Sequence, residues 1–379
     1  MLLTALFAFT AFNLASLALA EDPAYTTPYK HYSQVFDNIA ETLNDGQWGY
    51  GLKDLPKTAY TKKQWDWGKL PRVCFETAQV HNLYCDPHEV EVYEITYEDC
   101  DNPKIFCRCV YAEASIDEVA ERVGQIPVKA RQYVGVFSIY SSNKDAAAWA
   151  SGPEVAIFGR VEHMSIYIHE IAHHLDLYAV GGKDWFADYF PYSGLSAWRN
   201  KVAKDSCVPD EYSKKSYAED YANALVMAAY HGMIGDIFNL QTGQRPQGCM
   251  LEQLNTAIHH TIVERQLLTY DPSARCDIHW KEFAVVCQGY LARETGRCEG
   301  LPDYDAKVAE QDPEWFQTRA SFIDARKQDQ FSASSSRRIS SSMSKEQLES
   351  EKSMVDSANK KAGYPAQRSR GAHGRFFTA

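Results

Sequence analysis

Two histidines and a glutamate form the pattern with the clearest chemical meaning in this sequence. His169, Glu170 and His173 stand together in the segment His-Glu-Ile-Ala-His. On an α-helix, His169 and His173 lie one turn apart on one face, so both imidazoles can bind one Zn²⁺ ion at about 2.0–2.1 Å. Glu170 lies beside them, where its carboxylate can act on a water molecule instead of binding the metal. The segment therefore predicts a zinc site with a general base.

A third protein ligand has to come from another part of the chain. One class of zinc peptidases places a histidine or aspartate six residues after the second histidine, but Ala179 stands there. Glu219, near the start of the next predicted helix, is the better candidate, because its carboxylate can point back at the histidines. The neighbouring Asp220 would face about 100° away on that helix. Two other acidic residues remain weaker candidates for the third ligand: Asp184 and Asp188.

Helices and strands must position these groups, and the sequence predicts them around the motif. Helical spacing of apolar residues extends over 161–178, and two further helices are predicted over about 217–232 and 251–268. The β-forming runs 132–140 and 154–158 precede the motif and predict two strands. We expect 154–158 to be the edge strand that binds a peptide substrate through backbone hydrogen bonds.

The preceding part of the chain mixes short strands with a helix. Residues 92–97 and 105–111 predict strands, with a turn between them. Ser115 and Glu118 form a capping-box pattern, which predicts the start of a short helix. Together these elements predict an α+β fold, a small sheet with an active-site helix and following helices.

The N-terminus and the cysteines indicate an exported protein. Residues 1–20 are apolar and uncharged and end in Ala18-Leu19-Ala20, which predicts a cleaved signal peptide and a secreted protein, extracellular or in the cell wall. An even number of cysteines in an exported chain predicts a framework of five disulfides. Cys107 and Cys109 are too close in sequence to bridge each other, so each is expected to pair elsewhere. The ten cysteines are residues 74, 85, 100, 107, 109, 207, 249, 276, 287 and 298.

Charge and composition exclude some functions and divide the chain. A net charge of −11 and an isoelectric point near 5.6 argue against nucleic-acid binding through a basic patch. No second apolar run approaches twenty residues, so stable membrane insertion is not expected. The predicted regions after the signal are a cysteine-rich region at 21–112, a catalytic region at 113–300, an extension at 301–327 and a disordered serine-rich tail at 328–379.

The motif region resembles the gluzincin metallopeptidases, and most closely the catalytic domain of anthrax lethal factor and its relatives. The shared residues are His-Glu-x-x-His-x-x-Asp-x-Tyr-Ala from 169 to 179 and Glu-x-x-Ala from 219 to 222, and the resemblance covers about 150–235. It implies the zinc ligands His169, His173 and Glu219 and a catalytic Glu170. It also implies an oxyanion-stabilising tyrosine seven residues before the third ligand. Tyr212 has that position, with Tyr217 as the alternative.

Three other polar residues in or beside the motif helix have less specific interpretations. Asp176 either orients an imidazole as a hydrogen-bond acceptor or is a carboxylate on the helix surface. His163 and His174 point away from the ligand face by helical spacing, so we assign neither a functional role.

A second, weaker resemblance concerns the whole chain, and especially its cysteine-rich N-terminal part with the segment 97–109, which is similar to secreted fungal proteins described as conidiation-specific. The predicted function is a secreted zinc metallopeptidase that hydrolyses peptide bonds in a protein or peptide substrate. One alternative is a secreted structural or cell-surface protein whose metal stabilises the fold without catalysis. Another is a disulfide-stapled binding module without a metal. The sequence leaves substrate preference, disulfide connectivity and oligomeric state open.

Overall fold

The computed structural model describes residues 31–46, 49–80, 85–142, 147–183, 189–241, 245–280, 283–301 and 377–378. The predicted signal at 1–20 lies outside these residues. So does nearly all of the predicted C-terminal extension and tail.

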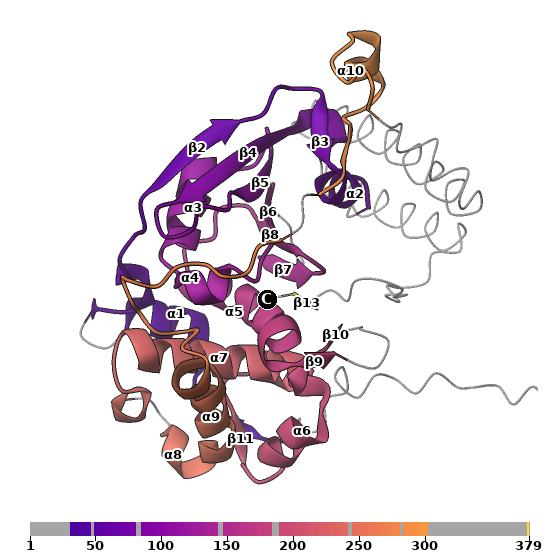
Figure 1. Ribbon diagram of the computed structural model, residues 1–379. Helices are drawn as coiled ribbons and strands as arrows, with labels where there is room; N and C mark the ends of the chain where they lie inside the picture. Colours follow the sequence, from indigo (N-terminus) through magenta and orange to yellow (C-terminus); the bar gives the residue numbers. More distant parts are fainter. Residues whose placement is uncertain are drawn as a thin grey trace, which may run out of the picture.

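The described residues form an α+β fold with a seven-stranded mixed sheet. Its strand order is β13-β7-β8-β6-β5-β4-β2. Strands β5, β6 and β8 run parallel, and the other neighbouring pairs are antiparallel. In Figure 1 the sheet lies above, the helices α6 to α9 lie below, and α5 lies between them. The strands are β2 (Tyr60–Gln64), β4 (Val90–Tyr97), β5 (Lys104–Cys109), β6 (Val136–Tyr140), β7 (Ala148–Ser151), β8 (Glu154–Phe158) and β13 (Phe377–Thr378).

The strand predicted at 154–158 exists with those bounds, but its expected place at the sheet edge is wrong. It is β8, which pairs with β6 on one side and with β7 on the other. All five residues of β8 and all five of β6 are buried. A short, almost wholly apolar run is typical of an interior strand covered on both faces. The strand on the outer side of β8 is β7.

The observed helices agree with the predicted helices in position more than in length. The motif helix α5 begins at Met164 and continues after His174 as a π-helical segment, and the helix predicted at 251–268 changes to π-helix after Ile258. The predicted strand at 132–140 begins only at Val136, because α4 precedes it. The helices are α1 (Ile39–Asp45), α2 (Arg72–Val80), α3 (Ile116–Gly124), α4 (Val128–Arg131), α5 (Met164–His174), α6 (Ser196–Val202), α7 (Tyr217–Met233), α8 (Pro246–Cys249), α9 (Leu251–Ile258) and α10 (Tyr290–Glu294).

The capping-box pattern in the sequence acts as expected. Ser115 caps α3: its hydroxyl accepts from the Glu118 amide, and the Glu118 carboxylate accepts from the Ser115 amide. This reciprocal pair satisfies backbone donors that a helix start leaves free. None of the described helices combines the length and apolar character needed to cross a membrane.

Short strands tie distant parts of the chain together. The parallel pair β1–β11 joins the N-terminal segment to the approach to α7, and α1 packs against α5. The sequence predicted a boundary between a cysteine-rich region at 21–112 and a catalytic region at 113–300. The sheet contains β4 and β5 from the first region and β6 and β8 from the second, so the two regions share one core. The remaining strands are β1 (Ser33–Gln34), β3 (Lys69–Pro71), β9 (Gly182–Lys183), β10 (Tyr189–Phe190), β11 (Cys207–Val208) and β12 (Val285–Cys287).

All ten cysteines form disulfides, as predicted. Cys107 and Cys109 each bond to a different partner, so their expected separation is confirmed. One bridge closes a long loop and connects the C-terminal part of the described chain to the sheet, whereas another is local. The pairs are Cys74–Cys107, Cys85–Cys109, Cys100–Cys276, Cys207–Cys249 and Cys287–Cys298.

A carboxyl group lies inside the sheet, at the start of β8. Glu154 is 2% exposed and accepts hydrogen bonds from the hydroxyl of Ser138 on β6 and from that of Thr77 on α2, the latter at 2.5 Å. Burial raises the pKa of Glu154 to about 7, although both hydroxyl donors oppose the shift. Folding therefore favours the protonated form of this group.

Replacement of Glu154 by glutamine should change how stability depends on pH. The folded protein retains the Glu154 proton up to about pH 7, whereas the unfolded chain loses it near its ordinary value. Wild-type stability should consequently fall as pH rises between about 4.5 and 7. The Glu154→Gln protein should lack this contribution. Urea unfolding of both proteins across that range measures the difference; parallel pH profiles would contradict the prediction.

Candidate metal centre

Three side chains from two helices meet in the core between α5 and α7. The Nε2 atoms of His169 and His173 lie 3.2 Å apart. Glu219, on the first turn of α7, places its Oε2 atom 2.9 Å from the first of these nitrogens and 3.3 Å from the second. All three residues are buried. We call this group the His–His–Glu cluster.

The spacing of the His–His–Glu cluster is compatible with a small cation. Ligand atoms around a tetrahedral Zn²⁺ ion, with bonds of about 2.0–2.1 Å, are separated by ~3.3 Å. The three observed separations lie between 2.9 and 3.3 Å. Two imidazoles and one carboxylate are also a donor set that zinc uses with a further open position. The residues present therefore fit zinc in both chemistry and spacing.

The charges in the cluster are strongly coupled. Burial would raise the pKa of Glu219, but the two histidines lower it to about 2, so this carboxylate stays ionised. Burial also lowers the pKa of both histidines; for His169 the hydrogen bond to Glu219 and the nearby charges outweigh it and raise the pKa to about 9. For His173 the effect of burial prevails and lowers the pKa to about 4. The two adjacent buried imidazoles therefore do not both carry a positive charge, and the cluster accommodates one such charge beside Glu219.

Asn223 orients His169 and was not identified from the sequence. Its Oδ1 atom lies 2.6 Å from His169 Nδ1, while its Nδ2 atom donates to Asp210 at 2.9 Å and to Ser213 at 3.0 Å. The acceptor Asp210 fixes the amide orientation, so Nδ1 of His169 is the donor and Nε2 faces the cluster. Asn223 stands one helical turn after Glu219, a spacing that could have revealed it.

Removal of this orienting amide should weaken zinc binding. The Asn223→Ala protein leaves His169 without its acceptor, and loss of such a partner typically costs about 10–100-fold in metal affinity. Competition with a chelating dye measures the change. Asn239→Ala, which removes an exposed amide bonded to Asp236, is the matched control. Equal affinities of the two variants would show that Asn223 does not position the ligand.

The proposed base and the two tyrosine candidates differ in their surroundings. Glu170 is fully buried on α5, and its charge contributes to the raised pKa of His169. The ring of Tyr212 lies edge-on to the His169 ring, with the ring centres 5.9 Å apart. The Nζ atom of Lys215 lies over the Tyr212 ring, 3.8 Å from its centre. Tyr217 instead stacks with the guanidinium of Arg199 at 5.4 Å. The ring of Tyr212 thus contacts a residue of the cluster.

The other acidic candidates have different outcomes. Asp176 is buried, so its interpretation as a surface carboxylate is wrong. The amide and hydroxyl of Ser193 donate to its carboxylate at 2.8 and 2.6 Å. Burial raises the pKa of Asp176 to about 7. Asp184 and Asp188 lie outside the described residues.

Comparison with known proteins places the chain in a family. The family model described as conidiation-specific protein Con-13 matches residues 40–337. The chain belongs to this family. It is 36% identical over 252 residues to conidiation-specific protein 13 of Neurospora crassa, across 66% of this chain and 69% of that protein. No solved structure matches it significantly.

The family match confirms the resemblance to fungal conidiation-specific proteins. The matched span of this Con-13 protein contains the His–His–Glu cluster, Glu170 and Tyr212.

A small cavity adjoins the His–His–Glu cluster on its α1 side. Its volume is about 190 Å³, and His169 and Tyr212 form part of its wall. Aliphatic side chains supply much of the remainder. The lining residues are Ile39, Ala40, Ser165, Ile166, His169, Asp210, Tyr212, Asn223 and Val226.

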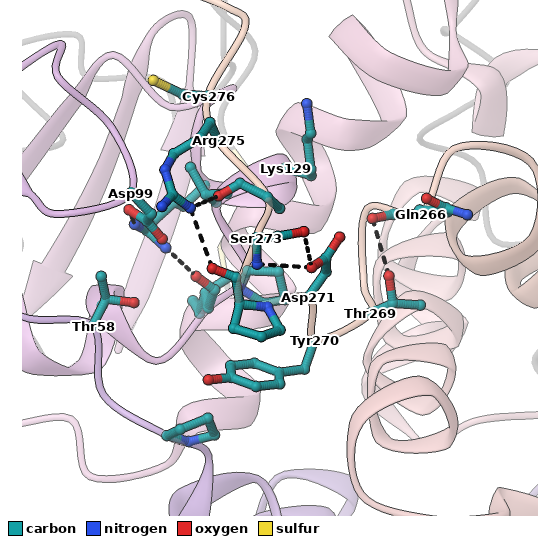
Figure 2. A pocket seen from close by; sticks show the side chains of 18 of the residues that line it. Thr58, Asp99, Lys129, Gln266, Thr269, Tyr270, Asp271, Ser273, Arg275 and Cys276 are labelled. Carbon is teal, nitrogen blue, oxygen red and sulfur yellow. Dashed lines mark hydrogen bonds and ion pairs between the residues drawn. The ribbon is translucent and has the colours of Figure 1, made fainter.

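A larger cavity of about 550 Å³ lies elsewhere in this Con-13 protein (Figure 2). Its lining is rich in charged groups that already have partners: Lys129 pairs with Asp277 at 2.8 Å, and Arg131 pairs with Asp99. The described lining includes none of the five predicted site residues. The walls come from four segments: residues 56–58, 98–99, 124–131 and 265–277.

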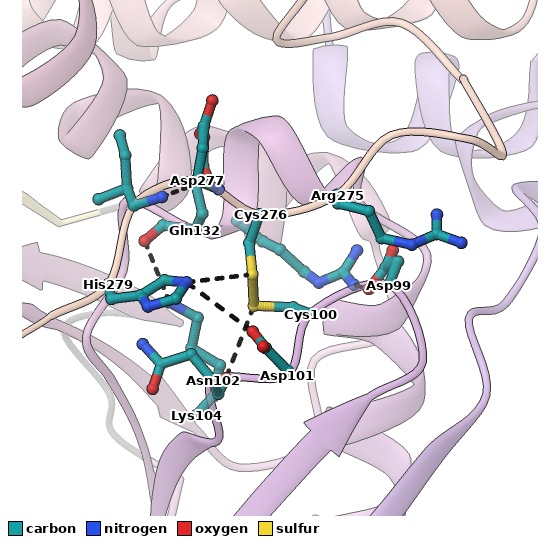
Figure 3. The surroundings of a disulfide bond; sticks show 12 residues. Asp99, Cys100, Asp101, Asn102, Lys104, Gln132, Arg275, Cys276, Asp277 and His279 are labelled. Carbon is teal, nitrogen blue, oxygen red and sulfur yellow. Dashed lines mark hydrogen bonds and ion pairs between the residues drawn. A yellow bond between two sulfur atoms is a disulfide. The ribbon is translucent and has the colours of Figure 1, made fainter.

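The Cys100–Cys276 disulfide holds one wall of this larger cavity against the sheet (Figure 3). Nε2 of His279 lies 3.7 Å from the sulfur of Cys276 and 3.9 Å from Asp101 Oδ1. These three side chains are close enough together to meet at one ion. A disulfide sulfur is not a thiolate, however, and therefore is a poor metal ligand. The same argument applies to Cys85, Glu89 and Cys109.

Proposed function

We propose that this Con-13 protein is a secreted, zinc-dependent peptidase with a zincin-like catalytic region. The observation that carries the proposal is the buried convergence of His169, His173 and Glu219, with Glu170 on the same helix. A purely structural zinc site usually has four protein ligands and no need of a carboxylate base. Three donors beside a buried glutamate favour an open, catalytic site.

Each residue has a defined task in this proposal. His169, His173 and Glu219 would hold the ion, and bound Zn²⁺ supplies a Lewis acid for a peptide carbonyl. Glu170 would take a proton from the attacking water and pass one to the leaving amine nitrogen. The Tyr212 hydroxyl would donate to the oxygen that becomes negative in the transition state. Asn223 keeps Nε2 of His169 directed at the cluster.

We propose that a substrate peptide binds along the outer edge of β7. It lies beyond β8 and contacts the motif helix α5. The backbone of Phe377–Thr378 already pairs with β7 in the antiparallel direction, which illustrates that this edge accepts an extended segment. A substrate peptide could take the place of this segment and bind in the same way, through backbone hydrogen bonds.

The disulfides support the proposed export. All ten cysteines are bonded, and such bridges persist mainly in oxidising compartments. The uncharged apolar run at 1–20 supplies the corresponding signal. We therefore propose that the protein acts outside the cell or in the cell wall.

Zinc content together with cleavage of a mixed peptide library tests the proposed function. Wild type and Glu170→Gln should both bind one zinc ion per chain, but cleavage by the variant should fall by about 10²–10⁴-fold, because the general base is lost. Glu219→Ala should lose the zinc. Glu121→Gln, a change at an exposed residue paired with Lys57, is the control and should resemble wild type in both measurements.

Two results would replace the proposal. Stoichiometric zinc with no cleavage by wild type would favour a structural or cell-surface protein whose metal stabilises the fold. Wild type without zinc after refolding in its presence would overturn the metal site itself.

A further inference from the structure

We infer that the larger cavity, between residues 56–58 and 265–277, binds a short neutral oligosaccharide. The inference is independent of the proposed peptidase function, because the described lining contains no residue of the His–His–Glu cluster. The volume of about 550 Å³ lies within the range of about 300–1,000 Å³ that is usual for small-molecule sites. A ligand of about two or three sugar rings is of this size.

Most charged side chains of the lining already have partners, so they do not select a charged ligand. Lys129 pairs with Asp277, and Arg131 pairs with Asp99. The lining holds five basic and four acidic side chains, so its charges nearly balance. The remaining basic residues pair with carboxylates beside the cavity or donate to backbone carbonyls: Lys57, Arg265 and Arg275.

Four other side chains of the lining are available to a ligand, since none of them bonds to another residue in the described part of the chain. They are Thr58, Glu98, Gln266 and Tyr270. The hydroxyl, amide and phenol groups among them can both donate and accept hydrogen bonds, as every sugar hydroxyl does. The Glu98 carboxylate accepts from hydroxyls but repels an anion. The available groups therefore suit a neutral ligand that is rich in hydroxyls.

Tyr270 supplies the apolar surface on which a sugar ring can stack. This residue is 57% exposed and lines the cavity. In Figure 2 its ring points from the 265–277 wall toward the wall that carries Thr58. A sugar ring has C–H groups on its faces, and packing them against an aromatic ring removes apolar surface from water. The hydroxyls at the edge of a stacked sugar are then free to meet the available polar groups.

The wall formed by residues 265–277 is held in place without a ligand. Cys276 is bonded to Cys100 in the turn between β4 and β5. The Asp277 amide donates to the side-chain oxygen of Gln132 at 2.9 Å. A site whose walls are already fixed loses little conformational freedom when a ligand binds. This matters for a sugar, because its hydrogen bonds replace equivalent bonds to water and gain little free energy.

Gln266 has an unusual backbone conformation in this same wall. Among the described non-glycine residues it alone has a positive φ angle, of 52°. The Thr269 hydroxyl donates to its carbonyl at 3.2 Å, and the following amide, of Leu267, donates to the Thr261 carbonyl at 2.6 Å. Backbone outliers of this kind persist where the surroundings impose them, and they concentrate at ligand-binding sites. Here the imposed conformation keeps an available amide in the cavity wall.

Titration calorimetry with four neutral trisaccharides tests the inference: maltotriose, cellotriose, laminaritriose and triacetylchitotriose. At least one should bind wild type saturably, with a Kd of about 1 mM or lower. Tyr270→Ala should weaken this binding by about 10-fold, because the stacking surface is lost. Tyr50→Ala is the matched control, since Tyr50 is 53% exposed and lies outside the lining. This variant should bind like wild type.

A charged probe and a second variant examine the polar groups. Trigalacturonic acid, an anionic trisaccharide, should bind wild type more weakly than the best neutral one, and Glu98→Gln should reduce that difference. No saturable binding of any neutral trisaccharide, equal affinities of Tyr270→Ala and Tyr50→Ala, or tighter binding of trigalacturonic acid would each overturn the inference. Because these titrations need neither zinc nor turnover, their outcome is separate from that of the peptidase test.

Discussion

The burial of α7 is the constraint on which the rest of the site depends. Every residue from Tyr217 to Tyr230 is buried, including three with carboxylate or amide side chains. Burial of such groups is costly unless they are hydrogen-bonded, paired or neutral. Glu219 meets two histidines, and Asn223 meets His169 and Asp210. Burial raises the pKa of Asp220 well above its usual range, which favours its neutral form.

The position of α7 in turn depends on segments that are distant from it in the sequence. The Cys207–Cys249 disulfide and the β1–β11 pair hold the approach to this helix. On the other side, α5 packs between α7 and the sheet, and the Tyr178 hydroxyl donates to the carbonyl of Gly152 in the β7–β8 turn. The His–His–Glu cluster is consequently a product of packing between distant segments, since neither α5 nor α7 alone carries all three groups.

The sequence predicted the helices and strands better than it predicted which of them pair or pack together. The capping pair at Ser115 and the interval between His169 and His173 depend on contacts within one helix, so local spacing is sufficient to identify them. The place of β8 depends on which strands pair with its two edges. Its apolar composition alone does not show that both edges are paired. The π-helical ends of α5 and α9 likewise follow from packing, because helical periodicity alone does not reveal them.

By itself, the sequence determined that two imidazoles and a carboxylate share one helix, that an α+β arrangement surrounds them, and that Cys107 and Cys109 bond to separate partners. These follow from short-range geometry and from the alternation of apolar residues. Only the tertiary structure decided the remaining relations: the approach of Glu219 to both histidines, the orienting role of Asn223, and the closure of the small cavity by α1. These contacts join residues up to more than a hundred positions apart, and their register is decided by how the buried faces of the helices and the sheet fit together.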